Sequence, residues 1–238
     1  MSTPPSPITL TGISSMATRA LLAELTAAFT RDTGVPVNIT AVGGVDAAKR
    51  VAAGEAFDVV VLASDALDKL IAAGHLPAGS RVDLVRSPVA VAVQAGAAVP
   101  DISSAAALRA AVLSAKSLSY STGPSGTFLL QLFERWGIAE TVKPRLVQAP
   151  PGVPVGSLVA SGEVALGFQQ LSELLPLPGI TVVGTLPEDA AYITTFSAAP
   201  GLHTAQAAQV HALLNYLNTP DAAAVKRRHG MSDCRSPA

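Results

Sequence analysis

The stretch Phe57-Asp58-Val59-Val60-Val61-Leu62-Ala63 is a nearly continuous apolar run of strand length. Such runs are typical of strands buried on both faces of a sheet, as in parallel sheets covered by helices. The next residues, Ser64-Asp65, are predicted to cap a helix over residues 66–73. The stretch therefore predicts one strand-to-helix step of an α/β fold.

The same alternation of apolar strands and amphipathic helices continues on both sides of this run. Upstream, we expect strands at 8–11 and 35–42, joined by a helix that Ser15 caps and that ends at Gly34. Further strands are expected at 117–121, 145–148, 164–169, 180–183 and 192–196, and further helices at 47–53, 105–115, 127–136, 155–160, 205–217 and 221–229. Strands that alternate with helices indicate an α/β protein with helical crossovers.

The segment 81–94 is the candidate for a crossing between two lobes. It holds two β-rich stretches divided by Ser87-Pro88, and proline suits a strand edge or a change of sheet. If the last two helices return to the first lobe, lobe 1 comprises residues 1–85 plus 196–238 and lobe 2 comprises 86–195. We then expect a ligand cleft between lobes that can hinge shut.

The charge balance gives no support for a nucleic-acid partner. The chain of 238 residues has 16 basic and 17 acidic residues, with 49% hydrophobic and 14% charged residues. A net charge of −1 leaves no broad basic surface for nucleic acid or an anionic membrane. The basic run Lys226-Arg227-Arg228 is interpreted as the solvated end of a helix, where cations complement the dipole.

Metal, cofactor and membrane signals are lacking in the sequence. Cys234 is the only cysteine, and the four histidines are scattered, so neither a metal site nor a cofactor is expected. No apolar stretch is long enough for membrane insertion, and the first residues do not read as a signal peptide. The expected location is therefore the periplasm if the chain is a mature form, and the cytoplasm otherwise.

Four segments rich in Gly, Ser or Pro each precede or open a predicted helix: Thr11–Met16, Gly43–Asp46, Gly123–Thr127 and Pro150–Ser157. A helix start presents unpaired backbone N–H groups and a partial positive charge, which bind anions without a cationic side chain. In open α/β sheets, ligands lie beyond the carboxyl ends of the strands. We therefore expect the four segments to bind one small anion.

Several motifs resemble those of the molybdate-binding proteins of bacterial ABC importers, over about residues 8 to 230. The motifs are Ile8-Thr9-Leu10 with Ser14-Ser15-Met16, Ala52-Ala53-Gly54-Glu55 before Phe57-Asp58-Val59-Val60, Ser87-Pro88 with Val89–Val93, Leu166-Gly167-Phe168-Gln169-Gln170, and Pro220-Asp221-Ala222-Ala223. The resemblance implies the type II periplasmic-binding-protein fold. In that fold each lobe is a mixed or mostly parallel sheet flanked by helices, and an oxyanion or carboxylate is held between the lobes. An ABC transporter permease is the partner that it implies.

In that family two serine hydroxyls, backbone N–H groups and a tyrosine hydroxyl hold the oxyanion. Ser15, Ser125 and Val153 match these positions, whereas Gly43-Gly44-Val45 stands for the second serine and Gln170 for the tyrosine. An amide both donates and accepts hydrogen bonds, which favours a carboxylic acid over a tetrahedral oxyanion. The expected ligand-binding residues are Ser14, Ser15, Arg19, Gly43, Gly44, Val45, Ser125, Gly126, Thr127, Val153, Gln169 and Gln170, with Arg19 as the one cation within reach.

A divergent branch of the family includes aconitate isomerases, and this chain resembles it in 81–87, 101–104 and 167–176. Their reaction, a 1,3-proton shift on an unsaturated tricarboxylate, needs a general base. Asp46 and Glu173 are the candidates, with Tyr120 a weaker one; each could instead serve as a helix-start residue, a solvated helix face or a core aromatic. A solute-binding protein, an isomerase of a small di- or tricarboxylate and a ligand sensor all remain open.

Overall fold

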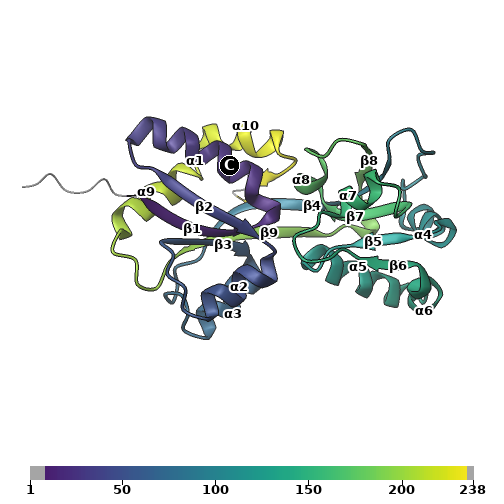
Figure 1. Ribbon diagram of the computed structural model, residues 1–238, viewed down its shortest axis with the longest axis horizontal. Coiled ribbons are helices and arrows are strands. Elements are labelled where there is room, and N and C mark those ends of the chain that lie inside the picture. The colour runs from purple at the N-terminus through teal and green to yellow at the C-terminus, as the bar shows by residue number, and fades with distance from the viewer. Residues whose placement is uncertain (1–8, 235–238) are drawn as a thin grey trace, which may run out of the picture. The chain divides into compact units, whose positions relative to one another are not determined.

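The computed structural model describes residues 9–234, and these form two compact units. Unit 1 runs to Val85 and resumes at Thr195, and unit 2 is Arg86–Thr194. The chain passes between the units within two long strands, β4 (Val82–Gln94) and β9 (Ile193–Pro200) (Figure 1). Ser87-Pro88 lies inside one continuous strand rather than between two separate stretches. The chain does pass from unit 1 to unit 2 next to this dipeptide, between Val85 and Arg86.

The sheet of unit 1 is built on three parallel strands. The strand β1 (Leu10–Ser15) pairs with β2 (Val37–Val42) on one side and with β3 (Val59–Ala63) on the other. On its other edge β3 pairs antiparallel with β9. The parallel strands end together, so the residues after β1, β2 and β3 lie at one edge of the sheet.

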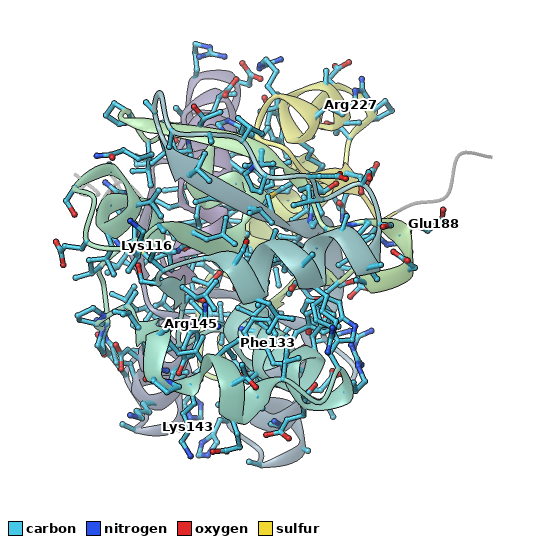
Figure 2. All side chains as sticks on the ribbon, turned by 90° about the vertical axis from the view of Figure 1, so that its right-hand side faces the viewer. Lys116, Phe133, Lys143, Arg145, Glu188 and Arg227 are labelled. Carbon is cyan, nitrogen blue, oxygen red and sulfur yellow. The ribbon has the colours of Figure 1, made fainter. Side chains whose placement is uncertain are left out.

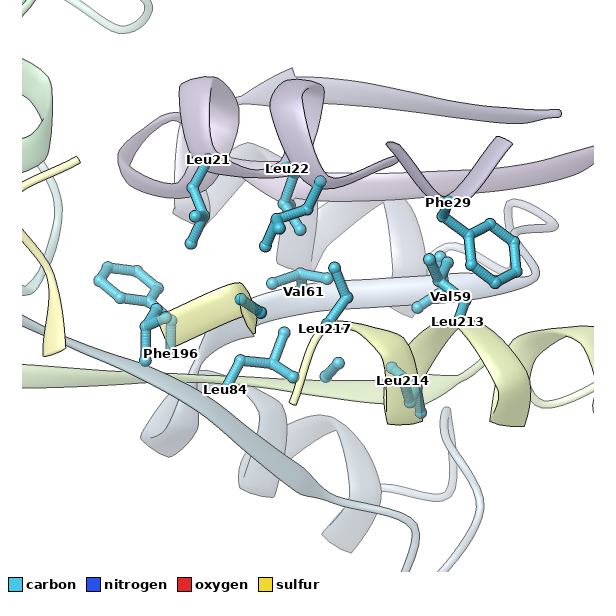
Figure 3. Close-up of a cluster of buried hydrophobic side chains, with 14 of the residues drawn as sticks. Leu21, Leu22, Phe29, Val59, Val61, Leu84, Phe196, Leu213, Leu214 and Leu217 are labelled. Carbon is cyan, nitrogen blue, oxygen red and sulfur yellow. The ribbon is translucent and has the colours of Figure 1, made fainter. Parts of the chain in front are cut away.

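Helices cover both faces of this sheet, which explains the apolar run from Val59 to Ala63. On one face lie α1 (Arg19–Thr33), α9 (Ala207–Tyr216) and α10 (Pro220–Arg228), and Figure 3 shows side chains of α1 and α9 that meet Val59 and Val61. On the other face, α2 (Gly44–Ala52) and α3 (Ser64–Ala72) pack on Val60 and Leu62. Every residue of β3 is buried.

The sheet of unit 2 is mixed. Its parallel part is β6 (Leu146–Gln148), β5 (Leu118–Tyr120) and β7 (Leu166–Gln170). The strand β4 pairs antiparallel with β7 and with β8 (Ile180–Thr185).

The helices of unit 2 also divide between the two faces of its sheet. One face carries α4 (Ala105–Ser114), α5 (Pro124–Arg135) and α6 (Ala139–Val142) around the buried Phe133 (Figure 2), whose ring meets that of Phe168 edge-on. The other face carries α7 (Val155–Ala160) and α8 (Leu171–Leu174).

The remaining elements are short. Three 3₁₀ turns occur at η1 (Met16–Thr18), η2 (Lys143–Arg145) and η3 (Glu188–Ala190), and β10 (Ser232–Asp233) pairs with β4. Within residues 9–234, no helix has both the length and the apolar character needed to cross a bilayer.

Two local predictions based on charge and capping were wrong. Arg227 and Arg228 are exposed in the last turn of α10, as expected. Lys226 is buried instead, and its Nζ donates to Leu84 O at 2.8 Å and to Asn218 Oδ1 at 3.0 Å. Ser64 is the first residue of α3 and not its cap. Its hydroxyl lies 2.6 Å from Ser197 Oγ instead.

The signals at other helix ends were confirmed. Gly34 ends α1 in the left-handed conformation, with φ of 75°. Thr219 caps α10 through its side chain, and Pro220 is the first helical residue. The expected strand at 8–11 starts at Leu10 in the structure, and Ile8 lies outside the described residues.

Candidate functional site

Two adjacent serines end β1 in unit 1. The exposed fractions of Ser14 and Ser15 are 0% and 6%, and neither hydroxyl has a hydrogen-bond partner among residues 9–234. The expectation that Ser15 caps the following helix was wrong, because its side chain makes no capping bond and α1 begins only at Arg19. A buried hydroxyl without a partner costs about 1–3 kcal/mol, so a ligand oxygen is the natural partner for these two.

The second glycine-rich segment lies beside these serines. Ser15 is paired in register with Val42, the last residue of β2, and Gly43 follows it in the chain. The helix α2 begins at Gly44, where an added Cβ would lie 3.7 Å from the Cβ of Ser15. The first N–H groups of α2, those of Gly44 and Val45, have no partner within the helix. Unit 1 thus brings the first two predicted segments together.

Asp46 lies in the first turn of α2 and is partly buried. This is a position where a carboxylate is stabilised by the helix dipole. The observation favours the structural alternative that the sequence left open for Asp46.

In unit 2, α5 begins with Pro124, and the buried Ser125 follows it. The hydroxyl of Ser125 lies 3.1 Å from that of Ser121, which also accepts from the backbone N–H of Gly123 at 3.3 Å. A Cβ on Gly126 would lie 1.8 Å from the carbonyl oxygen of Ser121, so only glycine fits this close approach. Sequence reasoning missed Ser121, although the spacing Ser-x-Gly-Pro-Ser holds a side-chain turn signal.

Thr127 and Val153 have weaker claims to contact a ligand. Thr127 is exposed, and its hydroxyl points to Gly123 O at 3.5 Å. Val153 is 37% exposed in the loop after β6, and its backbone N–H already donates to Pro150 O at 3.0 Å. A ligand would therefore compete for the Val153 N–H with this turn.

Gln169 and Glu173 form a hydrogen-bonded chain on the α7 face of unit 2. The Gln169 side chain accepts from Val155 N at the start of α7 and donates to Glu173 Oε1, both at 2.9 Å. Glu173 is partly exposed, and burial raises the pKa of its carboxyl to about 7, against the lowering effect of the Gln169 hydrogen bond. The alternative of a solvated helix face does not fit Glu173. The side-chain amide of Gln169 thus holds both Glu173 and the start of α7, because its nitrogen donates to the one and its oxygen accepts from the other.

Gln170 points to the other face of β7. Its side chain is 1% exposed and donates to Thr194 Oγ1 at 2.7 Å, while its Oε1 has no hydrogen-bond partner in the described part of the chain. Thr194 was missed by sequence reasoning, because a lone threonine in a strand gives no signal of a contact 24 residues away. The unpartnered amide oxygen is a second group that a ligand could satisfy.

Tyr120 is partly buried and packs against the core of α4 and α5. An added Cβ on Gly126 would lie 3.0 Å from its ring. This favours the core-aromatic alternative. In the described part of the chain, no group of three or more His, Cys, Asp or Glu side chains could hold a metal ion.

The comparison with known proteins agrees with this architecture. A family model described as bacterial extracellular solute-binding protein matches residues 10–232. The chain belongs to this family. An aconitate isomerase from a Pseudomonas species is 40% identical over 223 residues, which cover 90% of this chain and 84% of that protein. The molybdate-binding protein ModA of Escherichia coli K12 is 28% identical over 109 residues, or 46% of this chain and 42% of ModA.

Among solved structures, the periplasmic molybdate-binding protein of Azotobacter vinelandii matches with a TM-score of 0.77 at 21% identity, covering 96% of this chain and 100% of that one. The predicted resemblance to molybdate-binding proteins and to the branch with aconitate isomerases is confirmed, and so is the type II fold. This member of the solute-binding family is therefore related both to oxyanion binders and to an enzyme.

Proposed function

We propose that this solute-binding family member binds a small polycarboxylate and shifts a proton along it, in the manner of an aconitate isomerase. The observation that carries the proposal is the 40% identity to such an enzyme over 223 residues, a span that takes in most of both units. Relatedness at this level supports a shared substrate class more strongly than the 28% match to ModA over 46% of the chain supports an oxyanion.

The polar groups at the strand ends support a carboxylate ligand. The hydroxyls of Ser14, Ser15 and Ser125 and the start of α2 supply hydrogen-bond donors to an anion. Gln170 adds an amide, whose oxygen can accept from a hydroxyl or a protonated carboxyl group.

Glu173 is the proposed base. A carboxyl with a pKa of about 7 is ionised in about half of the molecules at neutral pH, so it can both take and return a proton. In the proposed step, the carboxylate of Glu173 takes a proton from a CH₂ carbon next to the double bond. The electron pair of the broken C–H bond spreads over three carbons, and Glu173 returns the proton to the far carbon. No oxidant or co-reactant is needed, and Gln169 is a positioning residue that orients the base.

The test is turnover of cis-aconitate, followed by NMR in D₂O, with Glu173→Gln as the key variant. We expect the wild type to form trans-aconitate and the variant to lose 10²- to 10⁴-fold in kcat, while calorimetry shows retained binding. Glu188→Gln, which changes an exposed carboxyl of unit 2 (Figure 2), is the matched control and should keep full activity. Full activity in Glu173→Gln would exclude Glu173 as the base.

A second candidate is transport binding of a molybdate-type oxyanion, which the serine hydroxyls and the match to ModA favour. Thermal unfolding with molybdate, tungstate, citrate and both aconitates separates the two, since a ligand at a hundred times its Kd adds about 2.7 kcal/mol of stability. Stabilisation by molybdate and tungstate alone would overturn the isomerase proposal. An ABC permease partner and a periplasmic location would then follow as proposals, testable by co-purification and cell fractionation.

A further inference from the structure

A groove of about 890 Å³ lies along α1 and β2 within unit 1. Ser14, next to the last residue of β1, and Arg19, the first residue of α1, are among the residues that line it. Polar side chains of Thr30, Asn38 and Thr40 line the remainder, between apolar residues of both elements. Arg19 is the one charged residue among those that line it, so the groove is electropositive at the end where β1 stops.

The charge of Arg19 is poorly placed for the stability of α1 itself. Arg19 is the first residue of this helix, and its first turn holds no acidic residue. A cation at a helix start opposes the helix dipole and destabilises the helix. Among residues 9–234, no carboxylate forms an ion pair with Arg19, and Thr18, before it, makes no capping bond. The start of α1 therefore carries a positive charge that a bound anion would neutralise.

Ser14 gives an independent reason to place that anion here. Its side chain is fully buried, and its hydroxyl has no hydrogen-bond partner in the described structure. Ser14 lines the same groove as Arg19. A hydroxyl and a guanidinium offer donors only toward a carboxylate, and the planar fork of arginine matches its two oxygens.

We infer that Arg19 and Ser14 together bind one carboxylate of the substrate at this end of the groove. The subsite makes the chain selective for ligands with several carboxylates, because the guanidinium of Arg19 stabilises a second carboxylate in addition to the first one bound. The inference rests on the proposed polycarboxylate function and deepens it. It names a residue, Arg19, that determines specificity and takes no part in proton transfer.

A double-mutant cycle on Arg19→Gln and Ser14→Ala tests the inference, with calorimetric binding of tricarballylate, a saturated tricarboxylate that cannot isomerise. We expect Arg19→Gln to weaken binding ten- to a hundredfold, as for a charge-assisted hydrogen bond. The double variant should lose less than the product of the two single losses, because both residues hold the same carboxylate. Ser14→Ala should leave the melting temperature of the free protein unchanged or higher, since it removes an unsatisfied hydroxyl.

Arg31→Gln is the matched control, because Arg31 is an exposed arginine near the far end of α1. It should bind tricarballylate as the wild type does. If the wild type turns over aconitate but Arg19→Gln binds tricarballylate with unchanged affinity, the inference is overturned and the proposed function stands. If the loss of affinity in the double variant equals the product of the two single losses, Arg19 and Ser14 do not hold the same carboxylate. A wild type that binds neither tricarballylate nor aconitate would overturn the proposed function and the subsite together.

Discussion

Replacement of Glu173 by Gln is expected to stabilise the protein above neutral pH while it lowers kcat by about 10²- to 10⁴-fold. Burial raises the pKa of the Glu173 carboxyl from an ordinary 4.5 to about 7. The folded protein therefore holds this proton more tightly than the unfolded chain does. Glutamine has nearly the same shape and can still accept the hydrogen bond that Gln169 donates at 2.9 Å.

The sign of the effect follows from proton linkage. Between pH 4.5 and about 7, the folded state binds more protons at Glu173 than the unfolded state does. The free energy of unfolding contributed by this group therefore falls as pH rises through that window and is constant outside it. The difference between the two pKa values corresponds to about 3 kcal/mol, which is an upper value because Glu173 is partly exposed.

The assay is urea denaturation of the wild type and Glu173→Gln at pH 5 and pH 8. The variant should gain up to about 3 kcal/mol over the wild type between the two pH values. Glu188→Gln serves as the control, because that exposed carboxyl lies on the same unit. A stability difference between wild type and Glu173→Gln that does not change with pH would refute the reasoning that burial holds the proton on Glu173.

Two further substitutions test the packing on which the site depends. Gly126→Ala places a carbon 1.8 Å from Ser121 O and should displace the start of α5. We expect the ligand affinity measured by calorimetry to fall at least tenfold. Gly123→Ala is the control and should fold normally, because the nearest atom to its added carbon is 3.6 Å away. Phe29→Ala, at a residue 2% exposed whose ring meets Tyr216 edge-on, should cost about 3–5 kcal/mol in chemical denaturation and leave the affinity of the folded protein unchanged.

The parts of the fold that were predictable are those with a strong local signal. The run from Val59 to Ala63 reads as a buried strand because every position is apolar, and it has a helix layer on each face. Gly34 and Thr219 mark helix ends by backbone and capping chemistry that acts over one turn. The short helix α8 was missed, since four residues carry too little periodicity to stand out.

Predictions failed where a distant part of the chain decides the environment. The sequence predicts Lys226 to be a solvated cation at a helix end. In the structure it is buried and donates to the carbonyl of Leu84, which lies 142 residues away in the chain. The sequence predicts Ser64 to be a helix cap, yet its hydroxyl forms a hydrogen bond with that of Ser197. Both outcomes depend on tertiary partners that no local pattern encodes.

The candidate site shows the same division. Residue type and position at strand ends were enough to select Ser14, Ser15 and Ser125 as candidates, because helix starts and hydroxyls are local features. Whether a hydroxyl is left without a partner is a tertiary property, and it separates Ser14 and Ser15 from Ser125, which lies 3.1 Å from the hydroxyl of Ser121.

The environment of Glu173 favours a chemical role over a structural one. A glutamine at this position would keep the hydrogen bond to Gln169 and would avoid the cost of burying a charge. Above neutral pH the carboxyl is therefore the less stable choice for folding. Groups whose pKa is displaced at a cost to stability cluster where proton transfer is needed. A 1,3-proton shift requires a group that exchanges a proton near neutral pH, which is why Glu173 is the proposed base.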